Sequence, residues 1–181
     1  MSVADRRSIK QAHEQFHVAN FLKWLNSTYR TDYVVVAEPD PPEAIIRSSR
    51  RTRWVEVTTA FLNSEFAQDV VSYATPGEEH KSIDGKLIVG PDEQFAHSFV
   101  DVVKKKLQKR TYAKFAQDYG PGFLIVPIHN PLFDRTTFDF MKRIWAETRV
   151  NDLGYFSSVR FAYRFGYDWK LHLWPRTGHL T

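Results

Sequence analysis

Residues 38–59, EPDPPEAIIRSSRRTRWVEVTT, contain two short apolar runs on either side of a basic turn. The runs are EAIIR (43–47) and RWVEVTTAF (53–61), and both are rich in the β-branched and aromatic residues that favour strands. With SSRRT between them, they predict a β-hairpin with a basic tip. YVVVAE (33–38) precedes the hairpin and is ended by prolines, which cannot donate to a strand ladder. The three runs together predict an antiparallel meander.

One acid, Glu56, stands inside the second strand of this hairpin. Because side chains alternate along a strand, Glu56 shares a face with Trp54 and lies opposite Val55. Either that face is wet, as in many amphipathic strands, or Glu56 joins a partly buried cluster with the acids beside the neighbouring strand, such as Glu43. Converging carboxylates repel one another, so a cluster of this kind persists when a hard divalent cation holds it.

The rest of the chain alternates helical and strand patterns. Apolar residues recur with a helical period from Ile9 to about Leu25 and again from Asp92 to Tyr119. FLIVPI (123–128) is a continuous apolar run, typical of a strand that is buried on both faces. We expect a further helix over about 135–149 and two closing strands, SSVRFAYRF (157–165) and WKLHLW (169–174).

Residues 62–91 fit a helix in their first half and an exposed excursion in their second. The predicted order of elements is therefore α-βββ-(α)-α-β-α-ββ. It contains no internal repeat and no linker, so we expect a single α/β domain over residues 1–181, built on a mixed sheet.

Composition narrows the class of protein. The 181 residues include no cysteine, which excludes disulfides, thiolate metal sites and a cysteine nucleophile. The polar start MSVADRRSIKQ and the lack of an apolar run near 20 residues favour a cytoplasmic protein without membrane contact. A net charge of +4 favours anionic partners. No Ser-His-Asp spacing and no phosphate-binding glycine loop is present.

A helix that carries a Glu, then a strand, then PPEAII, then WVEVT resembles the PD-(D/E)XK, or restriction-endonuclease-like, nuclease superfamily. The resemblance implies a mixed central sheet flanked by helices and a site for Mg²⁺ or Mn²⁺ that hydrolyses phosphodiester bonds. It assigns the two metal-binding acids of the strands to Glu43 and Glu56, with Asp40 as a competing placement for the first. Glu14 matches the acid that the family carries on its helix.

The sequence departs from the family where a lysine is expected, because Thr58 stands two residues after Glu56. The family's lysine offsets charge in the transition state. The segment VVKKKLQKR (102–110) offers a cation from another element, and Lys106 or Lys109 is the candidate. Three alternatives remain: a solvated basic stripe on the helix, a nuclease-like module that binds nucleic acid without cleaving it, and an interaction protein whose acids are only surface charge.

Nucleic acid, with DNA as the expected polymer, would be held through its phosphates. Oligomeric state is left open, and a homodimer is among the candidate states. The basic residues assigned to these contacts are Arg50, Arg51, Arg53 and Lys105.

A second motif, HEQFH (13–17), matches H-E-x-x-H. On a helix His13 and His17 lie one turn apart and could bind Zn²⁺, with Glu14 as the general base of a zinc metalloprotease. The extended form of that motif is absent, and an acid such as Glu38 or Glu43 would have to supply the third ligand. His129 and the remaining histidines are expected to be structural or exposed. The nuclease hypothesis uses Glu14 without either histidine.

Overall fold

The computed structural model describes residues 6–83, 89–165 and 168–175. No helix in these ranges is both long and apolar enough to cross a lipid bilayer. The elements, in chain order, are α1 (Arg6–Tyr29), β1 (Val34–Ala37), β2 (Ala44–Arg47), β3 (Thr52–Val57), β4 (Ala60–Phe61), α2 (Ser64–Ala74), α3 (Pro91–Leu107), the 3-10 turn η1 (Arg110–Tyr112), α4 (Ala113–Tyr119), β5 (Gly122–His129), α5 (Arg135–Glu147), β6 (Phe156–Phe165) and β7 (Asp168–Trp174).

Seven strands form one mixed sheet in the order β1-β2-β3-β5-β6-β7, with β4 also beside β5. The neighbours β1, β2 and β3 are antiparallel, which confirms the predicted meander. Both β3 and β4 run parallel to β5, β5 runs parallel to β6, and β7 returns antiparallel. Parallel neighbours need a long crossover, and the one from β3 to β5 contains α2, α3, η1 and α4.

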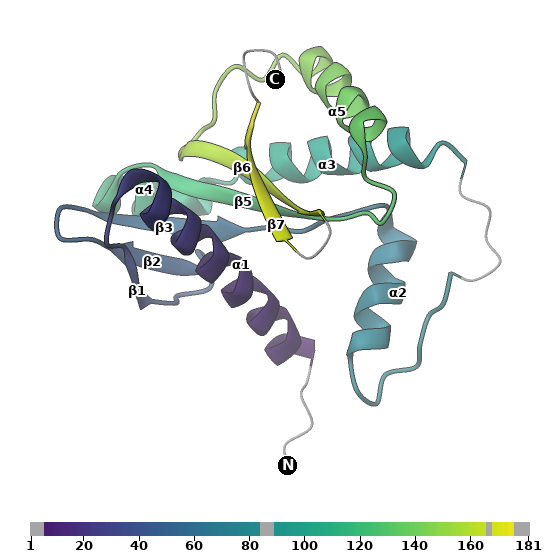
Figure 1. Ribbon diagram of the computed structural model, residues 1–181, viewed down its shortest axis with the longest axis horizontal. Coiled ribbons are helices and arrows are strands. Elements are labelled where there is room, and N and C mark those ends of the chain that lie inside the picture. Colours follow the sequence, from purple (N-terminus) through teal and green to yellow (C-terminus); the bar gives the residue numbers. More distant parts are fainter. Residues whose placement is uncertain (1–5, 84–88, 166–167, 176–181) are drawn as a thin grey trace.

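Helices cover both faces of this sheet (Figure 1). On one face α1 packs against β3 and β5, with Phe21 in the same cluster as Val55 and Val57. On the other face α3 and α5 pack together over a larger cluster that includes Trp54. The prediction of an α/β domain with a mixed sheet flanked by helices is confirmed, and so is the alternation along β3. The face that carries Glu56 lies under α3.

The prediction of one continuous helix over residues 92–119 is wrong. The α-helix ends at Leu107, Lys109 takes an extended conformation, and the chain resumes as η1 and α4. The break turns Tyr112 into the core, where its fully buried ring stacks on Trp54 with 5.3 Å between centroids. Helical spacing alone could not reveal this, because the apolar period continues across the break.

One strand boundary also differs from the prediction. The strand expected over 53–61 is divided into β3 and β4, with Thr58 and Thr59 between them. The first half of residues 62–91, which the sequence predicts as a helix, does form the helix α2. The Asn63 side chain caps its start by accepting from the backbone N–H of Phe66 at 2.8 Å. Of the expected excursion, residues 76–82 are exposed, and 84–88 lie outside the described residues.

Candidate functional site: an acidic cluster between two lysines

The register of the β2–β3 hairpin brings two predicted acids together. Ala44 lies opposite Val55 in the antiparallel ladder. Continuing that ladder by one residue puts Glu43, which directly precedes β2, beside Glu56. Opposite residues of such a pair have Cβ atoms about 5 Å apart. The prolines that end β1 thus return the chain so that both carboxylates stand at the same end of the hairpin.

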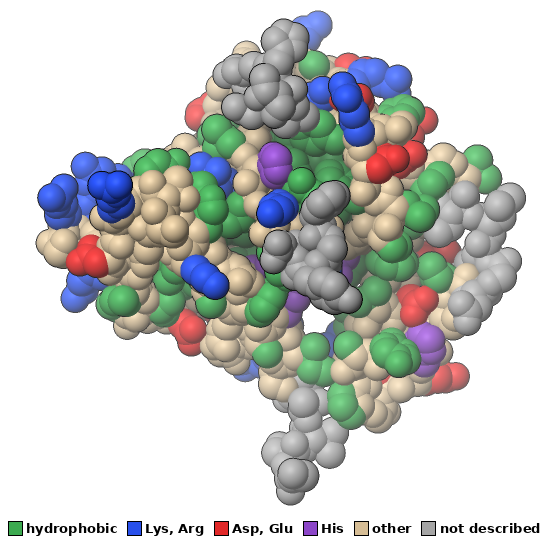
Figure 2. Space-filling view, viewed as in Figure 1, with side chains coloured by type: hydrophobic (Ala, Val, Ile, Leu, Met, Phe, Trp, Pro, Cys, Tyr) green, Lys and Arg blue, Asp and Glu red, His purple; other side chains and the backbone are tan. Residues whose placement is uncertain are grey.

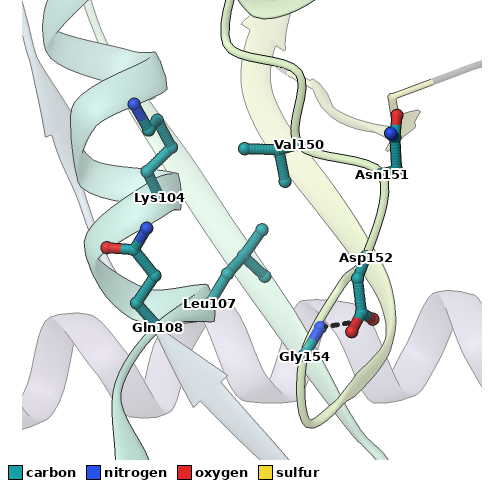
Figure 3. A pocket seen from close by; sticks show the side chains of 7 residues that line it. All are labelled: Lys104, Leu107, Gln108, Val150, Asn151, Asp152 and Gly154. Carbon is teal, nitrogen blue, oxygen red and sulfur yellow. Dashed lines mark hydrogen bonds between the residues drawn. The ribbon is translucent and has the colours of Figure 1, made fainter.

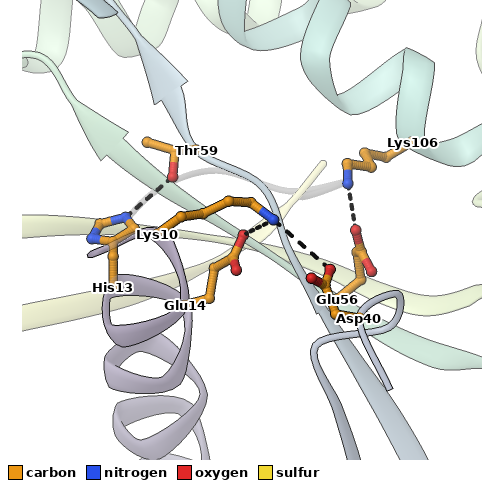
Figure 4. A network of polar contacts seen from close by, with 7 residues as sticks. All are labelled: Lys10, His13, Glu14, Asp40, Glu56, Thr59 and Lys106. Carbon is orange, nitrogen blue, oxygen red and sulfur yellow. Dashed lines mark hydrogen bonds and ion pairs between the residues drawn. The ribbon is translucent and has the colours of Figure 1, made fainter. Parts of the chain in front are cut away.

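Glu56 is a buried charge with one used and one unused oxygen. Its side chain is 1% exposed, so the interpretation of a wet strand face is wrong. Oε1 accepts from the ammonium of Lys106, which reaches down from α3 and is 22% exposed (Figure 4). Oε2 is buried and makes no hydrogen bond of ordinary geometry among the described residues, and the Tyr112 hydroxyl, which faces Glu56, is likewise unsatisfied. A buried carboxylate oxygen without a donor is costly, so this atom is a candidate ligand for a cation.

Helix α1 and the proline turn add a second ion-pair group next to the first. The ammonium of Lys10 lies 3.1 Å from Glu14 and 3.8 Å from Asp40, between the two carboxylates (Figure 4). Glu14 is buried, whereas the side chain of Asp40 is 53% exposed. Four carboxylates, those of Glu14, Asp40, Glu43 and Glu56, therefore share two lysines.

The electrostatics of the cluster match this excess of acids. Burial raises the pKa of Glu43 to about 8, helped by the charges of Glu14 and Glu56 and opposed by Lys10. Burial also raises the pKa of Glu14, although the hydrogen bond from Lys10 acts against it. Burial, then the charge of Glu56 and the approach of the Tyr112 hydroxyl to that carboxylate, raise the pKa of Tyr112. A cation that entered the cluster would favour the ionised form of Glu43 and so displace its proton near neutral pH.

Of the two lysines proposed as the replacement cation, only Lys106 lies at the acids. Lys109 is exposed, and its ammonium lies 5.7 Å from the centre of the Tyr112 ring. Thr58 is half-buried, and its backbone N–H donates to Ile125 at 2.9 Å, so it continues the contact between β3 and β5. The three residues that directly follow Glu56, Val57 to Thr59, therefore supply no cation.

The predicted phosphate-binding residues do not gather around the cluster. Arg50 and Arg51 are exposed at the hairpin tip. The tip is distant from the acids, because the four residue steps from Glu56 back to Thr52 alone span about 13 Å of β3. Figure 2 displays Lys and Arg side chains at the end of the molecule where Figure 1 has this tip and α4. Arg53 donates to the backbone oxygens of Tyr119 (3.5 Å) and Pro121 (3.4 Å), which gives it a structural role. Lys105 is exposed on α3.

The HEQFH motif is divided between two neighbouring sites. Glu14 turns to Lys10, and His13 turns to Thr59, with 3.2 Å from Nε2 to Oγ1 (Figure 4). One potential ligand atom each from His13, His17 and His129 lies within 4.8 Å of the others. The expectation that an acid such as Glu38 or Glu43 would complete the histidine pair is therefore wrong. Glu38 instead accepts from Gln15 at 3.1 Å.

Three residues of these sites were not identified from the sequence. Lys10 stands four residues before Glu14, a helical spacing that could have revealed the pair. No sequence pattern links Tyr112 to Glu56, or His129 to His13, because each pair joins elements that are distant along the chain.

A pocket of about 260 Å³ opens elsewhere, between the end of α3 and the loop before β6 (Figure 3). Its one carboxylate, Asp152, accepts from the backbone N–H of Gly154 at 2.9 Å and so shapes the loop. None of its lining residues belongs to the acidic cluster or to the histidines. They are Lys104, Leu107, Gln108, Val150, Asn151, Asp152 and Gly154.

The metal-free protein is expected to be most stable near pH 6.5. Burial lowers the pKa of His13 to about 4 and that of His17 to about 3. As pH falls below 6.5, the unfolded chain protonates these histidines and the folded chain does not, so stability falls. As pH rises from 4.5 to about 8, Glu43 ionises only in the unfolded chain, which also lowers stability. Below pH 6.5 the effect of two histidines on stability exceeds the opposite effect of one glutamate, so stability rises with pH. Above pH 6.5 only the glutamate of these three residues changes stability, which then falls.

Urea midpoints measured from pH 4 to pH 9 after removal of metal test this profile. Glu43→Gln should flatten the side above pH 6.5 and make the rise between pH 4.5 and pH 6.5 steeper, because the two histidines then act unopposed. A midpoint in this variant that still falls as steeply between pH 6.5 and pH 8 would contradict the role of Glu43.

Comparison of the chain with protein-family models, with curated proteins and with solved structures finds no match. The function of the acidic cluster is therefore argued from its own geometry.

Proposed function

We propose that this protein is a divalent-metal-dependent nuclease that hydrolyses phosphodiester bonds of nucleic acid. One observation carries the proposal: Glu56 is buried beside Glu43, with one oxygen on Lys106 and the other without a partner. A structural ion pair would be expected to satisfy both oxygens of a buried carboxylate. An unpartnered oxygen next to further carboxylates is instead suited to a hard cation.

Glu43 and Glu56 would hold Mg²⁺ or Mn²⁺, with Asp40 and Glu14 at the edge of the site. Carboxylate oxygens are the ligands these ions prefer, and phosphate oxygens of the substrate usually complete the set. A bound ion would supply a water of lowered pKa and polarise the phosphodiester. Lys10, which now offsets the charge of Glu14 and Asp40, would move away or turn to the substrate when the ion enters.

Lys106 would do what the family's strand lysine does. The lysine of the family stands two residues after the second acid on the same strand. Lys106 comes from α3 instead, and its ammonium contacts that acid, Glu56. A cation fixed by Glu56 at the edge of the cluster can stabilise negative charge on a phosphate in the transition state. Tyr112 and Glu56 are both buried, and surroundings of low dielectric strengthen both interactions.

The fold supports a restriction-endonuclease-like architecture at the level of element order. A helix with an acid, an antiparallel meander and a strand added parallel to the third strand follow one another, and both metal-binding acids come from the meander. The exposed arginines of the hairpin tip and Lys105 on α3 would contact backbone phosphates without reading sequence.

An assay of the chelator-treated protein on single- and double-stranded DNA and RNA tests the proposal. We expect cleavage that requires Mg²⁺ or Mn²⁺ and is lost when the metal is removed. Salt-sensitive binding without cleavage under all conditions would favour a nuclease-like module without turnover. Absence of both binding and cleavage would overturn the proposal.

Lys106→Met should lower kcat by about 10² to 10³ and leave KM nearly unchanged, because the ammonium acts on charge that develops during reaction. Methionine keeps an unbranched side chain of similar length at this position of α3. The control is Lys142→Met on α5, which removes an exposed lysine that pairs with Asp139 and lies over the Phe138 ring, away from the acidic cluster. Equal kcat values for the two folded variants, measured by single-turnover cleavage, would remove Lys106 from the mechanism.

A further inference from the structure

Three histidines from two elements meet where helix α1 crosses the end of β5. His13 and His17 lie one turn apart on α1, and His129 is the last residue of β5, paired in the sheet with Phe61 of β4. The centre of the His13 ring lies 4.6 Å from the centre of the His17 ring and 5.1 Å from that of the His129 ring. One nitrogen of each ring can be chosen so that all three lie within 4.8 Å.

Two of the three rings carry a buried nitrogen that bonds to nothing. Nε2 of His17 and Nε2 of His129 are both buried without a hydrogen-bond partner among the described residues. His17 as a whole is 2% exposed, so water does not readily reach it. Histidines that serve only to fill a core normally pair these atoms, because leaving a buried polar atom without a hydrogen bond is destabilising. Two buried nitrogens without a partner, on rings that each bring one nitrogen within 4.8 Å of the others, indicate a missing common partner.

The chemistry of the set selects the class of partner. Imidazole nitrogens suit Zn²⁺, Cu²⁺ and Ni²⁺, whereas Mg²⁺ and Mn²⁺ prefer oxygen. Tetrahedral zinc with bonds of about 2.0 Å needs nitrogens about 3.3 Å apart, so the rings must close by roughly 1.5 Å at most. Two of them are half-buried, which leaves a path for an ion.

The surroundings favour a held ion over a freely exchanging one. Thr59 is hydrogen-bonded to His13 at 3.2 Å and fixes the orientation of that ring, as groups behind metal-binding histidines commonly do. Trp169 packs edge-on to His17 at 4.8 Å, and Phe61 lies 5.3 Å from His129. These rings pack against His17 and His129 and limit the movement of the imidazoles.

We propose that His13, His17 and His129 form a site for one Zn²⁺-class ion that fastens α1 to the end of β5. The site is separate from the acidic cluster, because its ligands are nitrogens and because Glu14 turns away from it to Lys10. Three protein ligands leave a fourth position for water or a further ligand. The ion stabilises the crossing of the helix over the sheet and thereby holds Glu14 at the neighbouring acids.

The test is zinc binding by chelator-treated full-length protein, followed by competition with a chromophoric chelator and by thermal unfolding. We expect one Zn²⁺ per chain, a raised Tm, and no displacement by millimolar Mg²⁺. Co²⁺ bound in place of zinc should give the visible absorption of a tetrahedral ion. His13→Gln and His129→Gln should each lower zinc affinity by more than about 100-fold, beyond the effect of losing a supporting group.

Two controls make the outcome specific. His97→Gln on α3 removes an exposed histidine outside the group and should leave zinc affinity unchanged. Glu43→Gln should also retain zinc, whatever it does to nucleic-acid cleavage, so the two sites succeed or fail independently. The half-buried His13 and His129 are chosen because their variants should fold, which circular dichroism checks. No zinc-dependent rise in Tm in the native protein, or unchanged affinity in both histidine variants, would overturn the site.

Discussion

Glu56→Gln is expected to reduce phosphodiester cleavage by more than about 10³-fold, a loss of about 4 kcal/mol of transition-state stabilisation. The substitution removes the negative charge that pairs with Lys106. It also turns the carboxylate, whose Oε2 makes no hydrogen bond, into a neutral amide, which is a weaker ligand for a cation. Metal affinity and the position of the lysine are therefore lost together. Glutamine has the same shape and still offers an oxygen to Lys106, so the fold should survive.

Metal binding separates the two parts of this effect. Titration with Mn²⁺, followed by calorimetry, should show heat in the native protein and little in Glu56→Gln or Glu43→Gln. Asp40→Asn should have a weaker effect, because Asp40 is half-exposed and contacts only Lys10 among the cluster. The matched control is Glu93→Gln, which removes an exposed glutamate paired with Arg143. Unchanged cleavage in folded Glu56→Gln would remove the acidic cluster from the proposed mechanism.

Trp54→Ala is expected to lower the free energy of unfolding by about 3–5 kcal/mol. The indole is fully buried, stacks on Tyr112, and lies 4.9 Å from the ring of Phe156. Its Nε1 also donates to the backbone oxygen of Gly120 at 2.9 Å. Since a domain of this size is stable by about 5–15 kcal/mol, urea unfolding should record a large shift of the midpoint.

Gly122 makes this prediction sharper. A Cβ at this position would lie 2.4 Å from the Trp54 ring, so Gly122→Ala should destabilise the native protein by about 1–3 kcal/mol. In the Trp54→Ala background the same methyl group would enter the cavity left by the indole. The two substitutions should therefore cost less together than the sum of their separate costs. Additive values would show that the ring and the glycine do not contact one another.

The elements of the fold were largely predictable because their signals are local. Strand composition and prolines gave the meander, and the uninterrupted FLIVPI run gave the central strand β5. The break between α3 and α4 was not predictable, because it depends on the burial of Tyr112 against Trp54, two residues on different elements. A period in the sequence records which residues are apolar, and not where the helix must bend to bury them.

For the candidate sites the division is the same. From the sequence alone came the residue types, namely acids flanking a hairpin, a basic helix and a histidine pair one turn apart. Tertiary structure decided which of them meet. The ladder between β2 and β3 sets Glu43 beside Glu56, and the crossing of α3 selects Lys106 over Lys109. Spacing along a chain fixes neighbours only within one helix or strand, whereas contacts between elements follow from sheet order and helix packing.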